Sequence, residues 1–110
     1  MKIAARESTG STIFDVSGDI DLAHSPEMRK ALLGEIKEKK VPKVFLNLRD
    51  VRYIDSSGIA SLVEGLKASR DVGSRLILFG LSTSVREVMQ LSRLQKIFEI
   101  YDTEDKALSS

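Results

Sequence analysis

The chain has 110 residues, of which 42% are hydrophobic and 30% charged, as expected for one globular domain spanning residues 1–110. Its net charge is +1 and it has no tryptophan, so nothing favours direct nucleic-acid binding through a basic or aromatic surface. Cysteine is absent, which excludes disulfides and thiolate metal sites, and we expect a cytoplasmic protein with no signal peptide and no membrane insertion.

The first segments of the chain predict a β-hairpin. Residues 2–6 are weakly strand-like. In residues 12–18 the apolar Phe14 and Val16 alternate with polar residues, which is typical of a half-buried strand. A Gly-Ser turn joins the two segments, and we expect Gly18 and the aspartate after it to break the second strand, with residues 20–22 following as a short extension or a loop.

An amphipathic helix follows this hairpin. We expect Ser25 to cap it, with the next residue, a proline, in the first helical position. Met28, Leu32 and Ile36 recur every four residues and form its apolar face. The helix is expected to end near the lysines at 39–40.

The middle of the chain predicts a buried strand, a helix and a second buried strand. Residues 43–48 carry apolar side chains on both faces, which favours a central strand that continues through residues 49–54. A helix is expected to begin at Ser56 or Ser57 and to end near residues 71–73. The next strand covers residues 75–79.

The C-terminal part predicts a short helix, a short strand and a last helical turn. A capping box at residues 84–87 opens the helix, the strand covers residues 97–101, and the last turn covers residues 103–108. The order is then ββαβαβαβα. This order predicts an α/β fold, with a mixed sheet of about five strands and about four helices connected by crossovers.

The turn Asp55-Ser56-Ser57-Gly58 follows the central strand and precedes a helix. A serine hydroxyl there can cap the helix by accepting from its free N–H groups. The same helix N-terminus also favours an anion, so one of the serines could instead accept a phosphate. The spacing alone leaves both interpretations open.

The segment Asp55-Ser56-Ser57-Gly58-Ile59, together with Gly18-Asp19-Ile20-Asp21, resembles the STAS domains of bacterial anti-sigma factor antagonists. The predicted order of elements extends this resemblance over nearly the whole chain. It implies that Ser56, directly after the aspartate, is phosphorylated by a cognate anti-sigma factor, a serine kinase, and that a PP2C-type phosphatase reverses the reaction. Binding of the unphosphorylated protein to the kinase would release a sigma factor and so regulate transcription.

The resemblance also implies where the partner binds. The expected partner-binding residues come from three segments of the chain: Asp21, Asp55, Ser56, Ser57, Gly58, Ser82 and Thr83. Two of these segments have a purely structural alternative, with Asp21 as a turn residue and the hydroxyls of residues 82–84 as caps of the third helix.

Two other functions remain open at this point. Some STAS proteins bind the ATPase of an ABC lipid transporter and need no phosphorylation cycle, and gene neighbours would distinguish that role. An enzyme has little support, because the sequence has no phosphate-binding loop and its only histidine is His24. We therefore expect no catalytic residue, cofactor or metal site, and the oligomeric state stays unknown.

Overall fold

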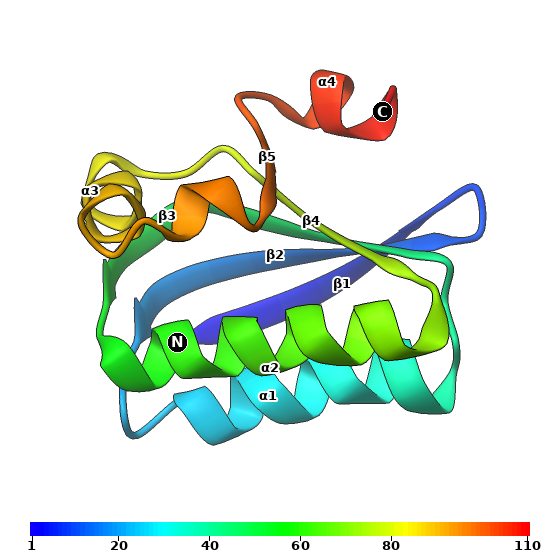
Figure 1. Ribbon diagram of the computed structural model, residues 1–110, viewed down its shortest axis with the longest axis horizontal. Coiled ribbons are helices and arrows are strands. Elements are labelled where there is room, and N and C mark those ends of the chain that lie inside the picture. Colours follow the sequence, from blue (N-terminus) through cyan, green and yellow to red (C-terminus); the bar gives the residue numbers. More distant parts are fainter.

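A five-stranded mixed sheet runs through the computed structural model, which describes residues 1–110 (Figure 1). The strands are β1 (Lys2–Ser8), β2 (Ser11–Ile20), β3 (Lys43–Ile54), β4 (Arg75–Phe79) and β5 (Glu99–Tyr101). The helices are α1 (Ser25–Leu33), α2 (Ser56–Val72), α3 (Thr83–Leu91) and α4 (Glu104–Leu108). A π-helical turn, η1 (Gly34–Glu38), extends α1, and a 3₁₀ turn, η2 (Leu94–Lys96), follows α3. The predicted order ββαβαβαβα is confirmed.

The strand order in the sheet is β1-β2-β3-β4-β5. Only β1 and β2 are antiparallel, and the other neighbours run parallel. The C-terminal ends of β2, β3 and β4 therefore meet at one edge of the sheet, which we call the carboxyl edge and define by Ile20, Ile54 and Phe79. Three helices, α1, α2 and α3, follow directly from this edge.

The two faces of the sheet carry cores of different size. Helices α1 and α2 lie side by side on one face (Figure 1), where the main cluster of 20 buried residues forms. The opposite face, the back face, has a cluster of five buried residues, in which Phe45 and its neighbours pack under Ala107 of α4. The prediction that the central strand is covered on both faces is therefore confirmed. None of the helices is both long and apolar enough to cross a membrane.

Several predicted boundaries are wrong. Strand β2 continues past Gly18 to Ile20, because Gly18 adopts a φ of 87° beside an irregularity in the pairing with β3, and this bends the strand without ending it. Ser25 lies inside α1, whose N-cap is His24 without a side-chain cap bond. The last strand begins only at Glu99.

The π-helical turn after α1 buries a carboxylate. The side chain of Glu35 accepts a hydrogen bond of 2.9 Å from the Thr12 hydroxyl of β2 and lies 3.0 Å from the Lys39 ammonium group. Both the hydroxyl and the ammonium group thus compensate the burial of the charge. This contact fixes the end of the first helical segment against the sheet.

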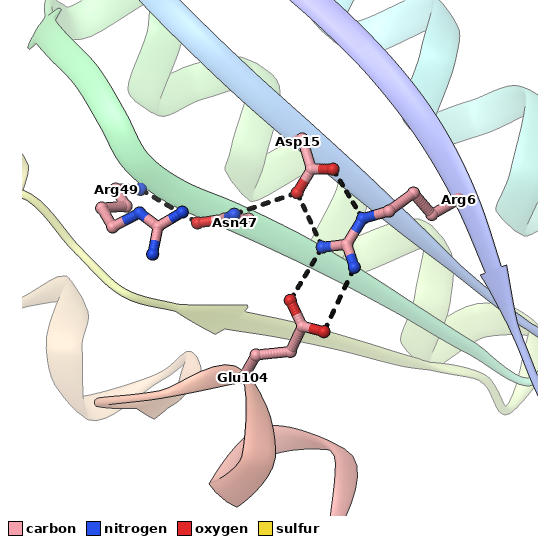
Figure 2. Close-up of polar contacts among 5 residues, drawn as sticks. All are labelled: Arg6, Asp15, Asn47, Arg49 and Glu104. Carbon is pink, nitrogen blue, oxygen red and sulfur yellow. Dashed lines mark hydrogen bonds and ion pairs between the residues drawn. The ribbon is translucent and has the colours of Figure 1, made fainter.

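A second polar group joins α4 to the back face (Figure 2). The Arg6 guanidinium donates to both carboxylate oxygens of Asp15, at 2.6 and 2.8 Å, and to both of Glu104, at 2.8 and 3.2 Å. Asn47 donates to Asp15 at 2.9 Å and accepts from the Arg49 backbone N–H at 3.2 Å. The hydrogen bonds from Arg6 lower the pKa of Asp15 and of Glu104, despite partial burial.

Candidate functional site

Asp55 caps helix α2. Its carboxylate accepts from the Gly58 N–H at 3.0 Å and from the Leu22 N–H at 3.1 Å, using a different oxygen for each. Its own N–H donates to the Ile20 carbonyl at 3.3 Å. The interpretation of Ser56 or Ser57 as the cap is therefore wrong, because the carboxylate occupies that position and also fixes the loop between β2 and α1.

The two serines after Asp55 differ in exposure. Ser56 is the first residue of α2, as predicted; its side chain is exposed and its hydroxyl makes no hydrogen bond within the protein. Ser57 is half-buried and lines a cleft of about 280 Å³ between α1 and α2, next to the ion pair of Arg29 and Glu64. Of the two hydroxyls, that of Ser56 is the more accessible to a partner.

Gly58 brings the turn close to the sheet. A Cβ atom at this position would lie 2.2 Å from the Ile20 carbonyl oxygen and 2.7 Å from Ile54 Cγ1. No side chain fits in this space, so the first turn of α2 rests directly on the ends of β2 and β3. The position of Ser56 is fixed as a result.

Asp21 acts as a turn residue. Its carboxylate accepts from the His24 N–H at 3.1 Å and lies 2.6 Å from His24 Nδ1. Burial raises the pKa of Asp21, but the contacts with His24 outweigh it and lower the pKa overall. His24 is bonded to Asp21 and to no serine, so these contacts do not form a Ser-His-Asp set.

The segment at Ser82 approaches the same edge of the sheet from β4. The Ser82 hydroxyl caps α3, accepting from the Val85 N–H at 3.4 Å, and donates to the Val51 carbonyl at 2.6 Å. The predicted capping box at Ser84 is therefore wrong, and the cap of α3 is Ser82. Thr83 is exposed. No hydrogen bond joins this segment to the Asp55 turn, although both lie at the carboxyl edge.

Sequence reasoning missed one exposed residue at the site. The side chain of Leu22 is 73% exposed, although its backbone is bonded to Asp55. The only signal in the sequence was an apolar residue in a polar loop. The arrangement therefore offers an exposed hydroxyl at a helix N-terminus, directly after the Asp55 carboxylate, and a loop bonded to Asp55 that carries Asp21 and the exposed Leu22. Nowhere in the chain do three or more metal-ligating side chains gather.

Comparison with known proteins agrees with this description. The STAS domain family matches residues 2–107. The anti-sigma-B factor antagonist of Listeria monocytogenes is 33% identical over 105 residues, covering 94% of this chain and 90% of the relative. The crystal structure of a candidate anti-sigma factor antagonist from Thermotoga maritima has a TM-score of 0.91 at 26% identity, covering 97% of this chain and 92% of that chain.

A third relative is similar in fold alone. The phosphorylated form of SpoIIAA from Bacillus has a TM-score of 0.75 at 21% identity, covering 98% of this chain and 97% of that chain. The fold and the turn thus define a small α/β domain with a hydroxyl presented at the carboxyl edge of its sheet. The chain belongs to the STAS domain family, and its curated relatives are anti-sigma factor antagonists.

Proposed function

We propose that this chain is an anti-sigma factor antagonist that binds a cognate anti-sigma serine kinase, and that phosphorylation of Ser56 ends the binding. One observation carries the proposal. Because Asp55 caps α2, the Ser56 hydroxyl is left exposed and without a partner at the first position of the helix. The names of the curated relatives support the regulatory role.

The helix start suits a phosphate. A phosphoserine carries a charge of about −1.5 to −2 at neutral pH. At the N-terminus of α2 this charge meets the positive end of the helix dipole, and the backbone N–H groups of the first turn can approach it. The isolated domain can therefore keep its fold when Ser56 is modified.

The complex with the kinase responds differently to the phosphate. The added charge lies next to the Asp55 carboxylate, and a partner surface that covers Ser56 would remove both from water. Burying an uncompensated ion costs several kcal/mol, and each 1.4 kcal/mol lowers the affinity about tenfold. We expect a loss of about a thousandfold in affinity, which a PP2C-type phosphatase would reverse.

The partner surface in this proposal lies at the carboxyl edge. It comprises Asp21, Asp55, Ser56, Ser57, Gly58, Ser82 and Thr83. The hydrogen bonds of Asp21, Asp55 and Ser82 are internal, so these residues shape the surface, whereas Ser56 and Thr83 are free to contact the partner.

The test uses the anti-sigma-type serine kinases of the source genome, each purified and incubated with this protein and ATP. Mass spectrometry should locate the phosphate on Ser56, and Ser56→Ala should abolish it, whereas the neighbouring Ser57→Ala should not. Titration calorimetry should show that Ser56→Asp weakens kinase binding. Two results would contradict the proposal: kinase binding unaffected by Ser56→Asp, or co-purification with a transporter ATPase and no kinase.

A further inference from the structure

Leu22 combines an exposed apolar side chain with a fixed backbone. Single exposed leucines are common on protein surfaces and by themselves mean little. Leu22 is 73% exposed, and it lies in a loop bonded at both ends to the rest of the domain. These bonds order the backbone of the loop, so the exposed side chain is presented from a fixed position.

Hydrogen bonds of the backbone hold the loop before and after Leu22. On its N-terminal side, the Ile20 carbonyl accepts from the Asp55 N–H at 3.3 Å, and the Leu22 N–H itself donates to the Asp55 carboxylate at 3.1 Å. On its C-terminal side, the Ser25 N–H at the start of α1 donates to the Asp21 carbonyl at 2.8 Å, so this bond spans Leu22. The loop is therefore preorganised.

One side chain connects this loop to the proposed phosphorylation site. One carboxylate oxygen of Asp55 binds Leu22 of the loop, and the other binds Gly58 in the first turn of α2, where Ser56 lies. Leu22 and Ser56 are thus held in a fixed arrangement. A partner that approaches the Ser56 hydroxyl therefore meets a loop that is bonded to the same aspartate and carries Leu22.

We propose that Leu22 is an apolar docking anchor for the serine kinase that acts on Ser56, and that Asp55 is the positioning residue that presents it. This inference rests on the proposed function. It commits to a kinase with an apolar pocket beside its phosphoryl-transfer site, which would remove the exposed Leu22 side chain from water. The bonded loop lowers the entropic cost of binding, because less has to be ordered when the partner docks.

The first experiment measures docking by the kinase that phosphorylates Ser56. Leu22→Ala should weaken its binding about tenfold or more, equivalent to ~1.4 kcal/mol, and should lower kcat/KM for phosphorylation without moving the modified site. The matched control is Val72→Ala. Val72 is also exposed and apolar, at 42%, but it lies at the far end of α2, so this variant should bind within about twofold of wild type.

The second experiment tests the positioning role of Asp55. Asp55→Asn keeps one acceptor oxygen for Gly58 but replaces the oxygen that binds the Leu22 N–H. Hydrogen exchange should accelerate at the Leu22 amide and stay unchanged at Leu46 in the central strand. In a double-mutant cycle, Asp55→Asn and Leu22→Ala should not be additive for kinase binding, because Asp55→Asn is expected to weaken docking by displacing the same side chain that Leu22→Ala removes.

Each other outcome overturns a defined part of the proposal. Wild-type affinity in Leu22→Ala removes the anchor and leaves the switch at Ser56 intact. Failure of every kinase to bind or phosphorylate the wild type removes the proposed function and the anchor with it. A loss of self-association in Leu22→Ala, measured by light scattering, with unchanged kinase binding, assigns Leu22 to a contact with a second copy of the chain.

Discussion

The carboxyl edge and the back face use their charged groups in opposite ways. On the back face, Arg6 donates to both Asp15 and Glu104, and the charges of three elements compensate within the protein. At the carboxyl edge, the Asp55 carboxylate binds only backbone N–H groups and leaves Ser56 exposed.

This difference separates polar residues that build the domain from those available to a partner. Side chains that bind one another across the fold join its elements and stabilise the domain. A carboxylate that orders the backbone around a free hydroxyl prepares a surface for recognition. Stability separates these two kinds of residue: substitutions at residues that build the domain should lower the free energy of unfolding, whereas removal of the exposed Ser56 hydroxyl should not.

The largest effect is expected where the carboxyl edge meets the core. Gly58→Ala places a Cβ atom 2.2 Å from the Ile20 carbonyl oxygen, so the first turn of α2 has to move away from β2. We expect a loss of ~3 kcal/mol in the free energy of unfolding, because overpacking against backbone is not easily relieved. Urea denaturation followed by circular dichroism measures this.

Gly34→Ala is the matched control for Gly58→Ala. No atom lies within 4 Å of a Cβ at Gly34, whose φ of −60° suits alanine. This substitution should leave stability unchanged or raise it by ~0.5 kcal/mol. Equal effects of the two substitutions would show that the turn does not rest tightly on the sheet.

On the back face, Arg6→Ala removes the shared partner of Asp15 and Glu104. The Arg6 side chain is 42% exposed, so solvent screening limits the expected loss to ~1 kcal/mol. Hydrogen exchange should also increase in α4, which this contact holds against the sheet. Arg52→Ala is the control: the Arg52 side chain is 77% exposed and 3.6 Å from Asp19, and its loss should cost less than ~0.3 kcal/mol.

The same network predicts a dependence of stability on acid. Hydrogen bonds from Arg6 lower the pKa of Asp15 and of Glu104 in the folded state. Their contribution is therefore present above the unfolded carboxyl pKa of about 4 and is lost as the pH falls through the lower folded values. Unfolding measured from pH 6 to pH 2 should show a steeper loss for wild type than for Arg6→Ala, and parallel curves would exclude this role of the network.

The fold follows from local patterns that survive in the structure. The alternation in β2 and the four-residue spacing from Met28 place apolar residues in the main core, and the apolar residues on both sides of β3 reflect its burial on both faces of the sheet. These patterns are why the order of elements was predictable. The ends of the elements were not predictable from the sequence. A glycine such as Gly18 can either end a strand or bend it, and only the pairing of β2 with β3 shows which of the two occurs.

The site was predictable in position but not in its bonds. Aspartate and serine both cap helices well, so the sequence Asp55-Ser56 does not reveal which one does. Two serines lie near the start of α3 in a similar way, and the sequence-based prediction placed the cap at Ser84, whereas the structure has it at Ser82. Contacts such as Arg6 with Glu104, 98 residues apart, leave no local signal, and neither does the bond that fixes Leu22.

The smallest expected effect on stability is at Ser56 itself. The Ser56 hydroxyl makes no hydrogen bond and Asp55 already caps the helix, so Ser56→Ala should change the free energy of unfolding by less than ~0.5 kcal/mol. Thermal denaturation of this variant beside Ser82→Ala makes the contrast direct. The Ser82 hydroxyl donates to Val51 and caps α3, so its removal should cost ~1 kcal/mol. A cost at Ser56 equal to that at Ser82 would mean that the Ser56 hydroxyl is part of the fold, and a kinase would then have to break a structural contact to reach it.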